Sequence, residues 1–158
     1  MSQMTGTDTA GRRSIAQVVG LLFGLTYLAV GLVGFAVTNG LDFASTEGDK
    51  LLGLFELNPL HNVVHLLIGA ALVWGSRRRD TARAINATVG ATYLLVGIAG
   101  LFITGNDDAN ILAINHADNV LHLASAAVLL GSALMSNDTE VRSDSGVTTS
   151  SRTTTGTR

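Results

Sequence analysis

The chain has 158 residues, of which 47% are hydrophobic and only 14% are charged, whereas soluble domains carry roughly 25% charged residues. This composition favours an integral membrane protein. A net charge of -2, without a basic patch interleaved with aromatic residues, argues against nucleic-acid binding. The absence of cysteine excludes disulfides, thiolate metal sites and cysteine nucleophiles, so any cofactor must be held by His, Asn, Asp, Glu or Met.

Four apolar segments predict an all-α bundle of four transmembrane helices. Ser14 to Val37 and Ala84 to Thr104 contain no charged residue, and each is long enough to cross about 30 Å of hydrocarbon at about 1.5 Å per residue. Leu60 to Ser76 and Asn119 to Ser136 are shorter. We expect a membrane domain over residues 12–136 with helices at about 14–37, 60–76, 82–104 and 118–136.

Local signals agree with these boundaries. Asn58-Pro59 combines an N-cap residue with proline at the first helical position, and either Asn115 or Asp118 suits the start of the last helix. Residues 1–11 and the Ser/Thr-rich tail over 137–158 have too few apolar side chains to order themselves, which predicts disorder. The apolar Leu51 to Phe55 is too short to span and is expected in the membrane interface.

The sequence also repeats itself. Gly24 to Gly34 returns as Gly90 to Gly100, and Asn62 to Leu66 returns as Asn119 to Leu123. The repeat predicts an internal duplication, in which two tandem helix hairpins form the four-helix bundle. It also favours a retained first helix over a cleaved signal peptide, because an uncleaved counterpart recurs later.

Charge sets the expected orientation in the cell membrane. The loops on one side of a four-span model carry arginine, and those on the other side are acidic apart from Lys50. By the positive-inside rule, both termini and the middle loop are cytoplasmic. The arginines are Arg12, Arg13, Arg77, Arg78, Arg79, Arg83 and Arg142; the acidic residues are Asp42, Glu47, Asp49, Glu56, Asp107 and Asp108.

The stretch from Asn58 to Gly69, with its Asn-Pro-Leu-His-Asn-Val-Val-His pattern, and the two Thr-Tyr-Leu-x-Val-Gly segments carry a family resemblance. Over residues 14–136 the chain resembles the prokaryotic four-helix integral membrane proteins of domain-of-unknown-function family 4383. The resemblance implies a bacterial or archaeal membrane protein of unknown specific activity. It supplies no catalytic residue.

Polar residues recur at one depth in both halves. Asn62 and His65 share a helix face, as do Asn119 and His122, and at this depth they should face the bundle interior. One interpretation is hydrogen bonding between helices. The alternative is ligation, either of haem iron by His65 and His122 or of a divalent metal, with His61, His65, Asp118 and His122 as ligands. His116 is a further candidate for such a metal site, and both His61 and His116 are secondary to the matched pairs of asparagine and histidine.

Small residues mark the expected packing faces. Gly24, Tyr27, Gly31 and Gly34 follow spacings of three, four and three, and the pattern recurs as Gly90, Tyr93, Gly97 and Gly100. Such a face lets a neighbouring helix approach closely. We also expect each tyrosine hydroxyl to hydrogen-bond within the bundle, for example to a histidine.

No familiar catalytic signature is present, which favours a non-enzymatic protein. The sequence is typical of a structural or partner-associating four-helix protein of the lipid bilayer, as a homo-oligomer or with another membrane protein. The alternatives are a haem- or metal-binding protein that uses paired histidines, and an oligomeric transporter of ions or small solutes. The almost wholly apolar cytoplasmic helix halves argue against conduction through a single bundle.

Overall fold

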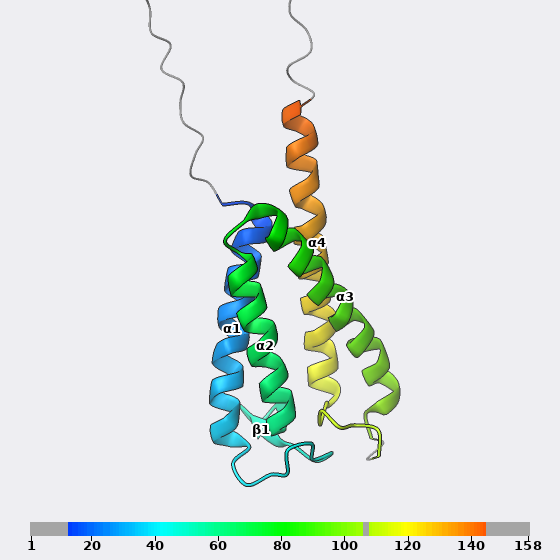
Figure 1. The fold of residues 1–158 in the computed structure, drawn as a ribbon. Coiled ribbons are helices and arrows are strands. Elements are labelled where there is room, and N and C mark those ends of the chain that lie inside the picture. The colour runs from blue at the N-terminus through cyan, green and yellow to red at the C-terminus, as the bar shows by residue number, and fades with distance from the viewer. Residues whose placement is uncertain (1–12, 106–107, 145–158) are drawn as a thin grey trace, which may run out of the picture.

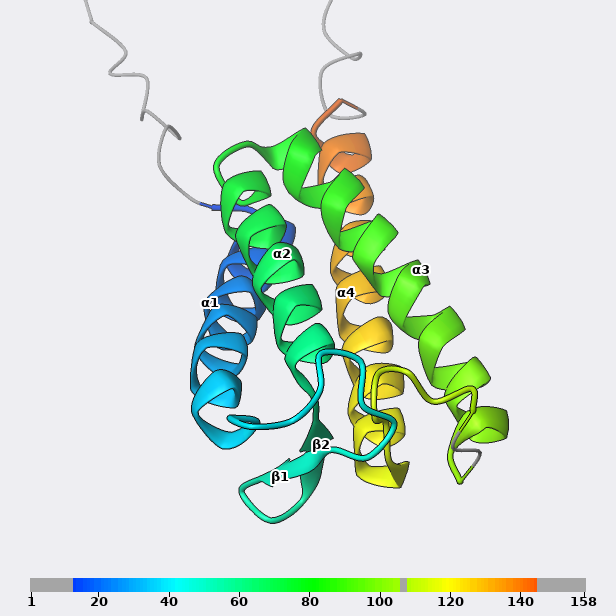
Figure 2. The ribbon, with the colours of Figure 1, turned by 60° about the horizontal axis from the view of Figure 1, so that its bottom comes forward.

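The computed structural model describes residues 13–105 and 108–144. Four helices form one bundle, in which α1 (Ile15–Val37) packs along α2 (Pro59–Gly75) and α3 (Arg79–Ile103) packs along α4 (His116–Asp144) (Figure 1). The connection between α1 and α2 contains a small antiparallel sheet of β1 (Asp49–Leu51) and β2 (Phe55–Leu57). Figure 2 shows this sheet at the end of the bundle opposite the turn between α2 and α3. Apart from this sheet the regular structure is helical, which confirms the predicted all-α class.

Two helix boundaries differ from those expected. α3 begins at Arg79, three residues before position 82, and α4 continues to Asp144, eight residues beyond position 136. Residues 136–144 contain neither glycine nor proline, and extending a formed helix gains one hydrogen bond per residue. The predicted disorder is therefore wrong for 137–144, while 1–11 and 145–158 lie outside the described residues.

The helix starts are capped by local side chains. Ser14 accepts a hydrogen bond from the Gln17 N–H, and Gln17 accepts one from the Ser14 N–H, which forms a capping box. Asn58 caps α2 ahead of Pro59, as expected. Each cap satisfies N–H groups that the helix itself leaves unpaired.

Hydrophobic and polar residues are distributed in the opposite way to that of a soluble protein. Large apolar side chains such as Leu32, Leu67 and Leu95 are 65–68% exposed on the outside of the bundle, whereas asparagines, histidines and serines are buried within it. The buried apolar cluster is small and centres on Leu72, Val89 and Leu129, together with the two tyrosines. An apolar exterior around a polar interior is the arrangement that a lipid solvent favours.

Glycines set the closeness of the helix pairs. A Cβ on Gly24 would lie 2.9 Å from the carbonyl oxygen of Gly69, and a Cβ on Gly69 would lie 2.8 Å from that of Gly24. The backbones of α1 and α2 thus touch where they cross. In α3, a Cβ on Gly90 would meet the side chain of Leu130 at 2.9 Å. Both glycine faces therefore lie at helix contacts.

The hairpin between β1 and β2 carries exposed apolar residues at its tip. Leu52 and Gly53 have φ values of 56° and 72°, as in the turns that suit the twist of short hairpins. Leu52 is 86% exposed and Leu54 is 54% exposed. The segment for which the sequence predicted an interfacial position is thus a projecting turn.

Candidate metal centre

Three histidines meet inside the bundle. His61 and His65 lie on the first two turns of α2, and His122 lies on the second turn of α4. One ligating nitrogen from each can be chosen so that all three lie within 4.8 Å of one another. The imidazole centroids of His61 and His65 are 4.5 Å apart, and those of His61 and His122 are 5.9 Å apart. The structure therefore adds His61 to the pair that the repeat made most prominent.

The helical repeat explains how α2 supplies two of these ligands. Residues four apart lie on the same helix face, so His61 and His65 both point towards α4. The position in α4 that aligns with His61 in the repeat is Asp118, so α4 contributes a single imidazole. The cluster is consequently built from two histidines of one hairpin and one of the other.

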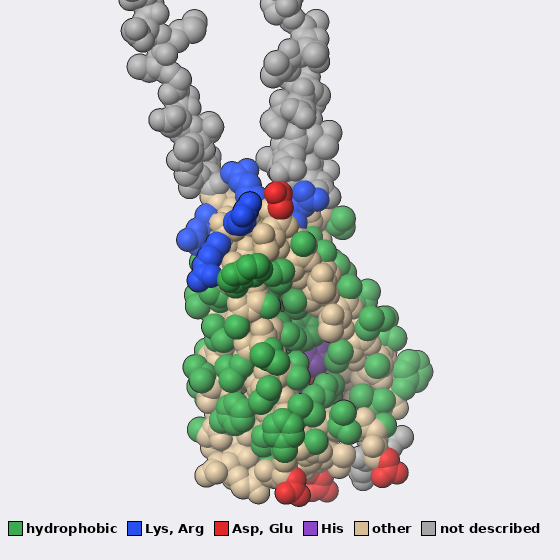
Figure 3. Space-filling view, viewed as in Figure 1, with side chains coloured by type: hydrophobic (Ala, Val, Ile, Leu, Met, Phe, Trp, Pro, Cys, Tyr) green, Lys and Arg blue, Asp and Glu red, His purple; other side chains and the backbone are tan. Residues whose placement is uncertain are grey.

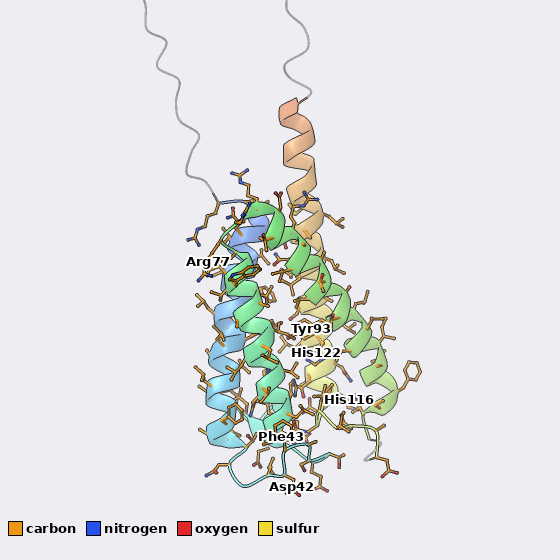
Figure 4. All side chains as sticks on the ribbon, viewed as in Figure 1. Asp42, Phe43, Arg77, Tyr93, His116 and His122 are labelled. Carbon is orange, nitrogen blue, oxygen red and sulfur yellow. The ribbon has the colours of Figure 1, made fainter. Side chains whose placement is uncertain are left out.

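Two tyrosines hold the imidazoles in place. The Tyr27 ring stacks on His65 with centroids 5.3 Å apart, and the Tyr93 ring stacks on His122 at 5.1 Å. The tyrosine rings meet each other edge to face at 5.4 Å. Figure 4 shows Tyr93 beside His122 in the middle of the bundle. The tyrosines thus contact the histidines through their ring faces, and within the described residues neither hydroxyl makes the hydrogen bond that we expected in the bundle.

The imidazoles are buried and retain free ligating atoms. His61, His65 and His122 are only 2–6% exposed. In the described part of the chain, the Nδ1 atom of each has no hydrogen-bond partner. The backbone of Leu112, in the loop before α4, and that of Glu56, in β2, approach the His61 ring. A buried polar atom without a partner is costly, so three imidazoles that meet at one place and each carry such an atom suggest a ligand.

The two asparagines of the predicted polar site lie elsewhere. Asn62 donates from Nδ2 to the Thr38 hydroxyl at 2.9 Å, and Asn119 donates to the Thr104 hydroxyl at the same distance. Thr38 and Thr104 are the C-cap residues of α1 and α3. Each asparagine therefore ties its helix to the end of the preceding helix and does not join the histidines.

Glycine makes room for each asparagine. A Cβ on Gly34 would collide with the Asn62 amide, and one on Gly100 would collide with that of Asn119. On the next turn, a Cβ on Gly31 would meet Leu66 at 2.8 Å, and one on Gly97 would meet Leu123 at 2.7 Å. The glycine faces thus accommodate the asparagine and leucine side chains of α2 and α4.

Asp118 has a capping role. Its carboxylate accepts hydrogen bonds from the Asn115 N–H at 3.0 Å and from the Glu56 N–H at 3.1 Å, and its own N–H donates to the Asn115 side chain. It is absent from the group of metal-ligating side chains found among the described residues. His116 is exposed at the end of α4 and lies apart from His122 (Figure 4). Neither residue joins the three-histidine cluster.

Some contributing residues were not singled out from the sequence. Asn86 donates from Nδ2 both to the Ala16 carbonyl at 2.9 Å and to the Ser132 hydroxyl at 3.0 Å, and so links α3 to α1 and α4. Thr38 and Thr104 were also missed, although they are 66 positions apart, the same offset as the glycine repeats. That offset was the available signal for the threonines, whereas Asn86 has no counterpart of its own type.

Packed side chains block access to the histidine cluster from both ends of the bundle. Leu72, Val89 and Leu129 fill the interior on the side of the α2–α3 turn, and Leu57 and Ile114 are buried beneath the loops at the opposite end. From the side, Figure 3 shows a small area of histidine surface framed by hydrophobic side chains. The cluster is therefore reached through the apolar flank of the bundle.

The lengths and composition of the helices indicate the class of protein. Three helices are long and apolar enough to cross a membrane, namely α1, α3 and residues 116–135 of α4, while α2 is a shorter apolar helix. With the apolar exterior, this defines a membrane protein with a polar interior. A family model described as Domain of unknown function (DUF4383) matches residues 17–135, and the chain belongs to that family. Searches of curated proteins and of solved structures found no match.

Proposed function

We propose that this protein binds one first-row transition-metal ion, copper or zinc, inside the membrane through His61, His65 and His122. The observation that carries this proposal is the convergence of three buried imidazoles whose ligating nitrogens lie within 4.8 Å of one another. Imidazole is a common ligand of zinc, copper, iron and nickel. A membrane-embedded metal-binding protein without enzymatic activity follows as the proposed function.

The spacing suits a small ion. A metal at about 2.0–2.1 Å from each imidazole nitrogen places the nitrogens roughly 3.4 Å apart in tetrahedral geometry. Small rotations of the side chains bring nitrogens from the observed spacing to that distance. Copper and zinc fit the donor set, because all three donors are neutral nitrogens and no carboxylate belongs to the group within the described residues.

A single ion fits better than haem. A planar macrocycle between His65 and His122 must displace His61, whose ring lies 4.5 Å from that of His65. It must also displace the stacked tyrosines, whose rings already cover both imidazoles. A metal ion needs only the space among the three nitrogens. This packing supports the ion over the haem alternative.

The closed bundle supports binding over conduction. Apolar side chains fill the interior on one side of the cluster, and loop residues cover the other. A transported ion needs a continuous polar path. The same packing supports a structural role for the metal, which would hold α2 and α4 together.

We further propose four membrane spans with an internal duplication. The contacts of Gly31, Gly34 and Asn62 in the first hairpin recur at Gly97, Gly100 and Asn119 in the second. α2 lies alongside α1 (Figure 1), which supports a span despite its 17 residues. Lys and Arg side chains gather at the end where α2 joins α3, and most of the visible Asp and Glu side chains lie at the other end (Figure 3), which supports a cytoplasmic position for both termini.

The proposal is tested by metal analysis of the purified full chain. Metal-free protein in detergent is incubated with Zn²⁺ or, under reducing conditions, with Cu⁺, desalted, and assayed by elemental mass spectrometry. We expect one equivalent of at least one ion per chain, and loss of that ion in His65→Ala and in His122→Ala. His116→Ala is the matched control and should bind as the unaltered chain does. Failure to retain either ion, or equal retention in all variants, would contradict the proposal.

A further inference from the structure

A lateral groove lies beside the histidine cluster between α1 and α4. Its volume is about 340 Å³, at the lower end of the roughly 300–1,000 Å³ typical of ligand pockets. Its walls are apolar, with Phe23 from α1 and Leu121 from α4 among them, and its remaining lining includes Tyr27, His65 and Ser125. Because Leu121 is 42% exposed, the groove opens sideways towards the space that lipid occupies in the proposed topology.

The polar groups of the groove are all neutral side chains or imidazole. The Tyr27 hydroxyl lies near the hydroxyls of Ser125 and Tyr93 but has no aligned hydrogen bond in the described structure. The Nδ1 of His65, in a side chain only 6% exposed, is likewise without a partner. None of the described residues that line the groove is Asp, Glu, Lys or Arg. An anionic or cationic head group would therefore enter without a counter-charge, at a high desolvation cost.

The depth of the groove also restricts its occupant. The α1 residues that line it run from Leu22 to Val30, in the middle of the Ile15–Val37 helix. A phospholipid head group stays at the membrane surface, whereas a neutral ring on an apolar tail can reach this depth. The occupant should then be a bilayer-soluble molecule with an uncharged polar head.

We propose that the groove binds the head group of a lipid-soluble quinone. A quinone ring carries carbonyl oxygens that accept hydrogen bonds, and the Tyr27 and Ser125 hydroxyls can donate them. The Phe23 and Tyr27 rings, whose centroids are 5.9 Å apart, provide aromatic surface against a planar ring. The volume accommodates such a ring with the start of its tail, and the rest of the tail extends into lipid. The groove shares His65 with the metal centre, but the proposed hydrogen bonds from Tyr27 and Ser125 do not require a bound metal.

Photolabelling of the full chain tests this site. The protein is placed in phosphatidylcholine nanodiscs and irradiated with an azido derivative of a decyl-substituted benzoquinone, and the labelled peptides are mapped by mass spectrometry. We expect labelling of α1 and α4 next to the groove, with competition by excess unmodified benzoquinone. Ala124→Phe, at an exposed position that lines the groove, should reduce that labelling by about tenfold or more.

Ala127→Phe is the matched control. Ala127 is also exposed on α4 but does not line the groove, so labelling should be unchanged. Equal labelling of both variants would overturn the proposal. So would labelling that unmodified benzoquinone fails to compete for, or a groove filled by a phospholipid acyl chain that benzoquinone cannot displace. Metal-free protein is used throughout, so the outcome is independent of metal binding.

Discussion

The two helix hairpins use the same packing contacts but differ at the site. In each hairpin an asparagine of the second helix holds the threonine that caps the first, over a glycine that makes room for it. The hairpins differ at the position just before each asparagine. His61 joins the imidazole cluster, whereas Asp118 caps α4. Packing is thus duplicated, whereas the candidate metal centre draws two ligands from one hairpin and one from the other.

The comparison of the hairpins also separates two groups of buried polar residues, the asparagines and the histidines. Asn62 and Asn119 each donate a hydrogen bond from Nδ2 to a threonine hydroxyl, while their Oδ1 atoms have no partner in the described structure. The histidine Nδ1 atoms have no such bonds in the described structure. What sets the histidines apart is that their imidazoles converge at one place, which favours a role in ligand binding for them, whereas each asparagine contacts a helix cap.

The largest expected effect is on metal affinity, when the two residues that distinguish the hairpins, His61 and Asp118, are each replaced by alanine. His61→Ala should weaken metal binding by more than about 100-fold, since even outer-shell changes cost about 10–100-fold. Asp118→Ala should leave metal affinity nearly unchanged, because Asp118 is outside the ligand group. Both affinities can be measured by competition with a chromogenic chelator. Equal losses in the two variants would show that the hairpins contribute alike.

The second-largest expected effect is on stability, when the equivalent glycines Gly24 and Gly90 are replaced by alanine. A Cβ at Gly24 would lie 2.8 Å from the Val73 backbone nitrogen, whereas one at Gly90 would lie 3.1 Å from the Leu130 backbone nitrogen, a slightly looser approach to backbone. Gly24→Ala should lower stability by about 1–3 kcal/mol, and Gly90→Ala by less. Unfolding by denaturant in detergent micelles gives both values. A larger loss for Gly90→Ala would reverse this ranking of the hairpins.

A smaller effect is expected for the α4 cap. Asp118→Ala removes hydrogen bonds from the Asn115 and Glu56 N–H groups and should cost about 1 kcal/mol of unfolding free energy. The exposed Asp42 provides a control, and Asp42→Ala should have little effect. If both variants unfold alike, the cap has no measurable role.

The smallest expected effect concerns the hydrogen bond between asparagine and threonine that both hairpins contain. Asn62→Ala and Asn119→Ala should each lower stability by roughly 0.6 kcal/mol, a typical value for hydrogen bonds between membrane helices. Metal affinity should stay the same in both variants. A double-mutant cycle with Thr38→Val isolates the Asn62 contact. Loss of metal in either asparagine variant would place these residues in the site after all.

Much of the fold was predictable because periodic signals are local. Uncharged runs, the Asn58-Pro59 start and the glycine spacing predicted four helices and their packing faces. The end of α4 was not predictable, since Ser, Asn, Asp and Thr after Met135 lack a strong signal for either helix or coil. In the site, the repeat drew attention to matched residues, so His61 was placed second although the i, i+4 rule put it beside His65. The separation of asparagine from histidine depended on tertiary contacts.

X-ray absorption at the metal edge tests the central proposal most directly. The metal-loaded full chain is predicted to show three imidazole nitrogens at about 2.0–2.1 Å, and the His61→Ala variant, if it retains metal, should show two. A shell dominated by oxygen, or an imidazole count that His61→Ala leaves unchanged, would contradict a metal centre built from His61, His65 and His122.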